Sequence, residues 1–213
     1  MIEITHSMLD DLRSQVSGAM SPKRFRHTVA VEAMTERLCN LFCPELCMPM
    51  RAAALLHDVT KELSLEQQEA LCRELGLTVT EADRLAPKTL HARTAAALIK
   101  LRHLAFNDPL IVHAVRWHTT GHADMTLTEK LLYLADYIDD SRSFESCVIL
   151  RRYFWGAEPE RMNPEERLSL LRDTLILSFD MTMRDLLADG NPISVETAEA
   201  RNALLLEKAK AIR

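Results

Sequence analysis

The sequence from position 52 to 61 reads Ala52-Ala53-Ala54-Leu55-Leu56-His57-Asp58-Val59-Thr60-Lys61. Its apolar, alanine-rich run predicts a packed helix that begins at Pro49 and extends to about Leu63. On such a helix Asp58 and Lys61 are neighbours at i and i+3, and His57 lies one turn before Lys61. A buried carboxylate beside an imidazole is costly unless its charge is compensated, and a metal ion is the commonest compensation. The stretch is therefore a candidate site, and its partners have to come from other helices.

The composition predicts an all-α protein with a single domain. The chain has 213 residues, of which 47% are hydrophobic and only 5 are glycine. Abundant Leu, Ala, Glu and Arg favour helices, and scarce glycine disfavours a turn-rich sheet fold. The net charge of −5 argues against a nucleic-acid partner, because general nucleic-acid binding needs a basic face.

Three sequence features predict a cytoplasmic protein without membrane association. No charge-free run approaches the roughly 18 residues that cross a bilayer. The N-terminus, from Met1 to His6, lacks the basic start and apolar core of a signal peptide. The five cysteines, an odd number without close pairs, are interpreted as reduced thiols. Three of them recur at four-residue spacing, but structural zinc sites use closer pairs, so we interpret Cys39, Cys43 and Cys47 as small core residues.

Four further polar residues lie at inward or otherwise apolar positions of predicted helices: His27, His91, His118 and Asp136. Each of their helices has a start signal, which is a capping side chain, a proline or both: Ser21-Pro22, Pro87, Asp108-Pro109, and Thr126 or Thr128. Singly, such a residue is more typical of a hydrogen-bonded core position than of a ligand. Together with the His57-Asp58 pair, they place inward polar groups on five successive helices.

Turn and capping signals predict the remaining helices of the chain. Ser64-Leu65-Glu66-Gln67 has the pattern of a helix cap, and Gly76 closes the helix that follows. The other predicted helices begin at serine, threonine, asparagine or proline and cover residues 7–20, 80–85, 163–189 and 192–213. No internal repeat or linker interrupts this all-helical pattern.

The ordered set of polar residues resembles the HD-domain metal-dependent phosphohydrolases, and most closely the YqeK family among them. The resemblance extends from about residue 21 to residue 202, with the motifs in the family's order. Six segments carry it: Lys23-Arg24-Phe25-Arg26-His27-Thr28, Leu55-Leu56-His57-Asp58-Val59-Thr60-Lys61, Leu90-His91-Ala92, Trp117-His118-Thr119-Thr120-Gly121, Tyr133-Leu134-Ala135-Asp136-Tyr137-Ile138 and Thr197-Ala198-Glu199-Ala200-Arg201-Asn202. The His-Thr-Thr-Gly and Leu-Ala-Asp-Tyr-Ile segments are far more specific than the His-Asp pair.

The resemblance implies a fold, a cofactor and a reaction. The fold is an all-α HD-domain helical bundle over residues 1–213, with a core at about 21–145 and C-terminal helices, about 146–213, packed on it. The cofactor is a pair of metal ions, iron in particular, with manganese or cobalt as substitutes. The reaction is the symmetrical cleavage of diadenosine tetraphosphate into two molecules of ADP. The chain departs from the family at Ala95 and at residues 139–142, so base and chain-length preference are less defined than the metal site.

Four imidazoles and two carboxylates form the expected ligand set: His27, His57, Asp58, His91, His118 and Asp136. This mixture of nitrogen and oxygen suits iron, manganese, cobalt or zinc better than magnesium, which prefers oxygen and water. Our hypothesis assigns one metal to His27, His57, Asp58 and Asp136, and the other to His91 and His118. Asp58 would bridge the two and is a candidate catalytic residue, because paired metals can activate water and polarise a phosphoryl oxygen.

A polyphosphate substrate also needs local cations in a chain of net charge −5. Arg24, Lys61 and Arg142 match basic positions of the family motifs and are the candidates, with Lys61 also a candidate catalytic residue. The turn after His118 supplies hydroxyl, backbone and imidazole groups for the phosphates: Thr119, Thr120, Gly121 and His122.

Two alternatives to this interpretation stay open. The first is another HD phosphohydrolase that acts on a different nucleotide. The second is a non-catalytic nucleotide-sensing module, which the intact set of six ligands disfavours. A homodimer through the exposed face of the last two helices also stays open, since nothing in the sequence singles out a partner.

Overall fold

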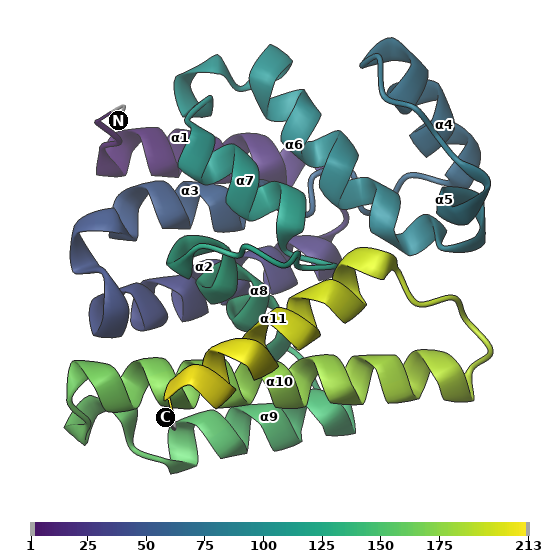
Figure 1. The fold of residues 1–213 in the computed structure, drawn as a ribbon. Helices are drawn as coiled ribbons and strands as arrows, with labels where there is room; N and C mark the ends of the chain where they lie inside the picture. Colours follow the sequence, from purple (N-terminus) through teal and green to yellow (C-terminus); the bar gives the residue numbers. More distant parts are fainter. Residues whose placement is uncertain (1–2, 212–213) are drawn as a thin grey trace.

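The computed structural model describes residues 3–211, and within that range it contains eleven α-helices, four short 3₁₀ helices and no strand. The predicted all-α fold is confirmed (Figure 1). Residues 1–2 and 212–213, which the predicted domain includes, lie outside the described residues. In chain order the elements are α1 (His6–Ala19), α2 (Pro22–Phe42), η1 (Pro44–Leu46), α3 (Cys47–Leu56), α4 (Leu65–Glu74), α5 (Glu81–Leu85), η2 (Pro87–Thr89), α6 (Leu90–Arg102), η3 (Leu104–Phe106), α7 (Pro109–Trp117), α8 (Leu127–Ile138), α9 (Glu145–Gly156), η4 (Pro159–Arg161), α10 (Pro164–Ala188) and α11 (Val195–Ala211).

Side-chain caps fix the starts of the main helices where the sequence predicts them. The hydroxyl of Ser21 accepts a hydrogen bond from the Arg24 N–H before α2, with Pro22 in the first turn. Full capping boxes begin four helices, because each capping side chain and the side chain three residues later bond each other's backbone N–H. These boxes belong to α4, α5, α8 and α10.

The predicted helix through His57 and Asp58 is wrong in its end. Helix α3 stops at Leu56, and the next residues form tight turns closed by bonds such as Lys61 N–H to Asp58 O at 3.0 Å. Within these turns the buried hydroxyl of Thr60 donates to the carbonyl of His91 on α6 at 3.0 Å. This contact joins the turn that carries His57 and Asp58 to α6. Asp58 lies beyond the end of α3, where it faces His91 and His118.

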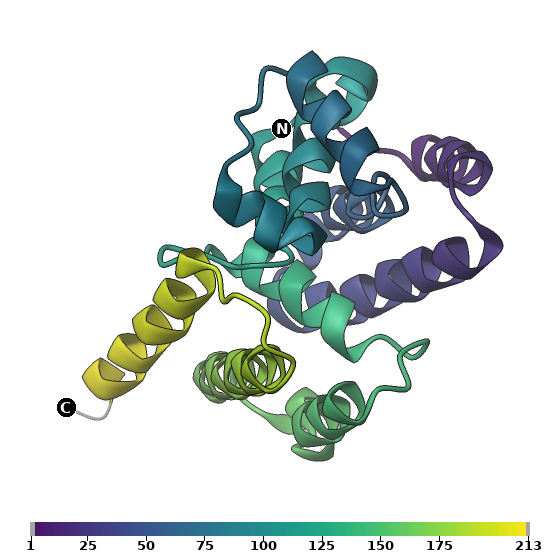
Figure 2. The same cartoon turned by 90° about the vertical axis from the view of Figure 1, so that its right-hand side faces the viewer.

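Helices α2, α3, α7 and α8 form the centre of the bundle, with α6 packed against α7 and α1 against α3 (Figure 1). Helix α10 packs against α8, α9 and α11, so the C-terminal helices cover one side of that centre (Figure 2). One continuous core joins both parts, from Leu55 and Leu132 to Phe179 and Leu204, all of which are buried. The division of the chain at about residue 145 therefore stays a prediction.

Helix α9 has no counterpart among the helices that the sequence predicts one by one. It buries Cys147, Leu150 and Phe154 against the core. Among the described residues, no helix combines the length and the apolar character that a membrane crossing requires.

Candidate metal centre

Asp58 lies at the centre of the polar residues that the sequence singles out. Its two carboxylate oxygens face different histidines. Oδ2 is 3.3 Å from His57 Nε2 and 3.7 Å from His27 Nε2. Oδ1 is 3.2 Å from His91 Nε2 and 3.8 Å from His118 Nε2. One carboxylate thus lies between two groups of imidazoles.

Asp136 on α8 completes the cluster on the side of His27. Its Oδ1 is 2.9 Å from His27 Nε2 and 3.7 Å from His57 Nε2. On the other side, the Nε2 atoms of His91 and His118 are only 3.0 Å apart. The structure therefore brings all six predicted ligands together, from helices α2, α6 and α8 and from the turns that end α3 and α7.

Three of the four histidines are oriented by the backbone of their own segment. In each, Nδ1 donates to the carbonyl three residues earlier: His57 to Ala54 at 2.6 Å, His91 to Lys88 at 2.7 Å and His118 to Val115 at 2.7 Å. A carbonyl can only accept, so Nδ1 carries the proton and Nε2 keeps its lone pair toward Asp58. Metal-binding histidines have this second hydrogen bond almost without exception.

His27 is oriented by side chains instead. Its Nδ1 lies 3.3 Å from Ser141 Oγ and 3.4 Å from Asp139 Oδ2, and Asp139 is fully buried. Asp139 also accepts from the Ser141 N–H at 2.9 Å, which folds the turn after α8 under His27. Asp139 and Ser141 were not predicted from the sequence, although they lie in the segment 139–142 where the chain departs from the family pattern.

Burial and neighbouring charges shift the pKa of the clustered groups in opposite directions. Burial raises the pKa of Asp58, but the imidazoles around it outweigh burial and hold it well below its usual range. Burial also raises the pKa of Asp136, and Arg142 together with His27 outweighs it in the same way. Burial lowers the pKa of His91 to about 4. Burial also acts to lower the pKa of His27, but the nearby carboxylates of Asp136 and Asp139 outweigh it and raise the pKa of His27 to about 9. Both carboxylates are therefore ionised at neutral pH.

Several inward atoms of the cluster make no hydrogen bond to any described residue. These buried atoms are His27 Nε2, His57 Nε2 and Asp58 Oδ1. Within the cluster, His27–His57–Asp136 and His57–Asp58–His118 each have ligand atoms within 4.8 Å of one another. Unsatisfied buried imidazole nitrogens and carboxylate oxygens that converge in this way fit metal ions, which would compensate their desolvation.

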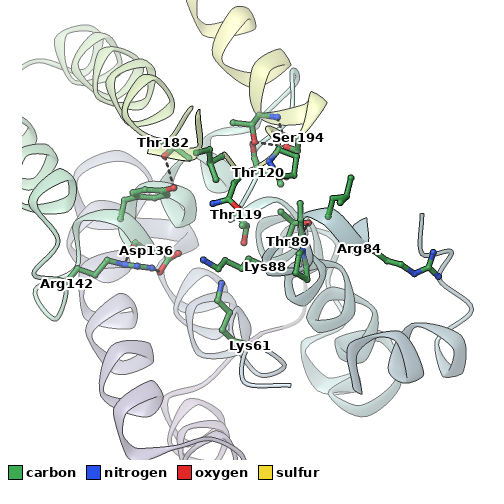
Figure 3. A pocket seen from close by; sticks show the side chains of 18 residues that line it. Lys61, Arg84, Lys88, Thr89, Thr119, Thr120, Asp136, Arg142, Thr182 and Ser194 are labelled. Atoms are coloured by element: carbon green, nitrogen blue, oxygen red, sulfur yellow. Dashed lines mark hydrogen bonds and ion pairs between the residues drawn. The ribbon is translucent and has the colours of Figure 1, made fainter. Parts of the chain in front are cut away.

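A cavity of about 590 Å³ opens beside the cluster (Figure 3). It lies between α8 with the segments around Lys61 and Lys88 on one side and α10 with the start of α11 on the other. Four of the predicted functional residues line it in addition to Asp136: Lys61, Thr119, Thr120 and Arg142. Burial lowers the pKa of Lys61, and its Nζ lies 3.2 Å from His91 Nε2. Lys88, which was not predicted from the sequence, lines the same cavity and points toward Asp136 in Figure 3.

The two predicted arginines contact the carboxylates of the cluster. Arg24 Nη1 donates to Asp58 Oδ2 at 2.6 Å, and Arg142 donates to Asp136. Arg142 also lines the cavity, whereas Arg24 does not. Both arginines therefore contact the cluster directly, and in the structure their charges are paired with its carboxylates.

Gly121 and His122 are not brought to this cavity. The N–H of Gly121 donates to the Trp117 carbonyl at 2.9 Å, so it is not free to donate to a phosphate. Gly121 has φ +63°, and an added Cβ would lie 2.8 Å from Phe179 Cζ, so this glycine lets the turn pack on α10. The His122 ring lies 3.3 Å from Glu129 Oε1 and packs on Trp117. The roles expected of these two residues have no support in the structure.

The fold and this six-residue cluster define a class of protein. Residues 24–140, just over half of the chain, match the HD domain family. The chain belongs to the HD domain family, and its predicted resemblance to HD-type hydrolases is confirmed.

Its relatives narrow the class further. The chain is 29% identical over 195 residues to a symmetrical bis(5'-nucleosyl)-tetraphosphatase of Halalkalibacterium halodurans, a match that covers 91% of this chain and 95% of that protein. It is 28% identical to the protein of the same name from Bacillus subtilis, over 89% of this chain and 94% of that protein. A crystal structure of an HD superfamily hydrolase from Clostridium acetobutylicum, described as involved in NAD metabolism, superposes with a TM-score of 0.79 at 28% identity and covers 96% of this chain and 100% of that one.

Proposed function

We propose that this HD-domain protein is a metal-dependent hydrolase that cleaves diadenosine tetraphosphate symmetrically into two molecules of ADP. The observation that carries the proposal is the position of Asp58, whose Oδ2 faces His57 and whose Oδ1 faces His91, beside a cavity lined with cations. The names of the relatives from Halalkalibacterium halodurans and Bacillus subtilis support the substrate and the cleavage position.

The six residues would hold two metal ions, with Asp58 between them. His27, His57 and Asp136 surround the first position, and His91 and His118 surround the second. We propose iron as the metal, with manganese or cobalt as substitutes, because mixed imidazole and carboxylate ligands suit these ions. Bound in such a pair, metal ions activate water and stabilise the charge that develops in phosphoryl transfer.

The residues of the chain would bind and orient the polyphosphate. Lys61, Lys88 and Arg142 line the cavity from different segments and would offset the phosphate charges. Thr119 lines the cavity beside the cluster, since its hydroxyl is 3.2 Å from His91 Nε2. From there it would donate a hydrogen bond to an oxygen of the phosphate under attack. Lys61 Nζ approaches the same imidazole, which places a cation where the leaving phosphate would gain charge.

Product analysis tests the proposal. Purified protein loaded with iron, manganese or cobalt is incubated with diadenosine tetraphosphate, and the nucleotides are separated by chromatography. We expect ADP alone, no product after the metal is removed by a chelator, and no product from Asp58→Ala. The matched control is Asp124→Ala, which removes an exposed aspartate outside the cavity and should keep the wild-type rate.

Other products would lead to other conclusions. ATP with AMP would keep a hydrolase but contradict symmetrical cleavage. Turnover of NAD or a mononucleotide instead would indicate a different HD phosphohydrolase, and NAD is included because of the description of the Clostridium relative. Tight nucleotide binding without turnover would indicate a sensor. Cytoplasmic location and a homodimer remain predictions.

A further inference from the structure

A second cavity, of about 460 Å³, adjoins the one beside the metal centre. Five residues line both cavities and form a shared wall: Ala86, Thr89, Thr120, Pro192 and Ser194. Figure 3 labels three of them, Thr89, Thr120 and Ser194, among the residues that line the first cavity. Beyond this wall, α5, α6, α7 and α11 supply the lining of the second cavity.

Arg116 is the unusual residue of the second cavity. Its half-buried guanidinium stacks on the Trp117 indole, 3.9 Å from the ring centroid, and makes no ion pair or hydrogen bond with any described residue. A partly desolvated cation without a carboxylate partner favours an anionic ligand.

No other charged residue in the described lining of the second cavity forms an ion pair with Arg116. Arg93 is paired with Asp83 at 2.9 Å, so these two charges cancel. Glu196 is the remaining acidic residue in the lining, and no ion pair joins it to Arg116. Within the described part of the chain, the cavity therefore offers one free guanidinium and one free carboxylate, a set that can bind a phosphate and a ribose hydroxyl at the same time.

A dinucleoside polyphosphate has a nucleoside at each end of its phosphate chain. A cavity of 590 Å³ has the volume of a site for one drug-sized ligand, which suits one nucleotide rather than two. We propose that the second cavity binds one terminal nucleotide of the substrate, with Arg116 on the phosphate next to the ribose, while the phosphate chain crosses the shared wall to the metal centre. This inference rests on the proposed function, and it assigns that substrate a second binding site in the same chain.

Binding measurements on the metal-loaded protein test the second site. The probe is a diadenosine tetraphosphate analogue in which a methylene group replaces the central bridging oxygen. We expect Arg116→Gln to raise its dissociation constant by about tenfold or more, since hydrogen bonds to charged groups contribute this much, and to raise KM for diadenosine tetraphosphate by the same factor.

Arg37→Gln is the matched control. Arg37 also stacks on an indole, that of Trp155 at 4.1 Å, but it lies outside both cavities. Loss of an arginine–tryptophan contact alone would affect both variants equally, so the binding defect should appear only in Arg116→Gln. A second variant, Ala82→Trp, enlarges an exposed residue in the lining of the second cavity while Arg116 is kept, and it should weaken analogue binding as well.

The outcomes separate this inference from the proposed function. If wild type cleaves diadenosine tetraphosphate while Arg116→Gln and Ala82→Trp bind the analogue as tightly as wild type, the second site is wrong and the function stands. If wild type neither binds the analogue nor cleaves the substrate, both are wrong. If Arg116→Gln does not fold, Ala82→Trp decides.

Discussion

The four histidines of the candidate metal centre are oriented in two different ways. His57, His91 and His118 are each held by a carbonyl three residues earlier in their own segment. His27 is held by Asp139 and Ser141, which lie more than a hundred residues away in the chain. Three of the imidazoles are therefore oriented by contacts within their own segments, whereas His27 depends on the turn after α8 being packed against α2.

This contrast determines where substitutions can act. A backbone carbonyl cannot be removed by mutation, so the His91–His118 half can be damaged only through its ligands or its backbone conformation. The His27 half can also be damaged through its supporting carboxylate. Four predictions test the comparison, from the largest effect to the smallest.

Replacing a ligand of the backbone-held half should have the largest effect. His118→Ala removes an imidazole that is fully buried at the centre. Activity should fall by more than the roughly 10–100-fold typical of outer-shell changes, and the bound metal should fall from two ions toward one. Metal analysis and initial rates measure this. His113→Ala removes an exposed histidine from the same helix and should match wild type; an equal loss in both variants would contradict the assignment.

Gly121→Ala should strain the turn that carries His118. Its φ of +63° is unfavourable for alanine, and the new Cβ would also lie 3.0 Å from Met125 Sδ and 3.1 Å from Ala200 Cβ. The expected loss is about 2–4 kcal/mol in the free energy of unfolding, from backbone strain and overpacking together. Urea denaturation measures it.

The control for this change is Gly18→Ala. Gly18 lies in α1, where an added Cβ would meet open space, so alanine there should stabilise the protein by about 0.5–1 kcal/mol. Equal stability of wild type and Gly121→Ala would show that the turn tolerates a side chain and does not depend on glycine.

Asp139→Asn should weaken only the half that side chains support. The amide keeps the shape of the carboxylate but loses the negative charge beside His27, so metal affinity should fall by about 10–100-fold at one of the two positions. Calorimetric titration of the metal-free protein with metal ions measures the affinity of each of the two positions. Asp140→Asn is the matched control, because Asp140 is 73% exposed and, among the described residues, pairs only with Arg37 and Arg151. A uniform loss at both positions would contradict a division into halves.

The same two aspartates show what the sequence can and cannot predict. The six ligands were predicted as a set through the family resemblance, and some of them also interrupt an apolar helical pattern, as Asp136 does between Ala135 and Tyr137. Asp139 and Asp140 follow the end of α8, where no periodicity distinguishes the buried residue from the exposed one. The sequence therefore could not identify Asp139 as the support of His27.

Tertiary contacts account for the other differences between the predicted and the observed structure. Helix starts were predicted well because caps are local, as at Ser64 and Asn163. Helix α3 ends at Leu56, and the turns after it include a bond from Thr60 to α6, a tertiary contact that no local pattern reveals. The role of Gly121 likewise depends on Phe179, which approaches from a distant helix. Local chemistry predicted most of the helices and their polar residues, but not helix α9 or the turns that orient those residues.

The smallest expected effect is at Asp83, which lines the second cavity. Its carboxylate is held both by a backbone N–H and by a side chain. Asp83 accepts from the Thr80 N–H at 2.8 Å and pairs with Arg93 at 2.9 Å. Burial raises the pKa of Asp83, but these two contacts outweigh burial and lower it below 3.8. Its contribution to stability is therefore fully present above pH 3.8 and is lost as the pH falls through the lowered pKa.

Asp83→Asn should lower the free energy of unfolding by about 1 kcal/mol at pH 7, the value of a helix cap, and the difference from wild type should shrink below pH 3.8. Urea denaturation of the metal-free proteins at pH 7, 5 and 3 measures this, and a difference that stays constant across the series would show that the charge of Asp83 contributes nothing.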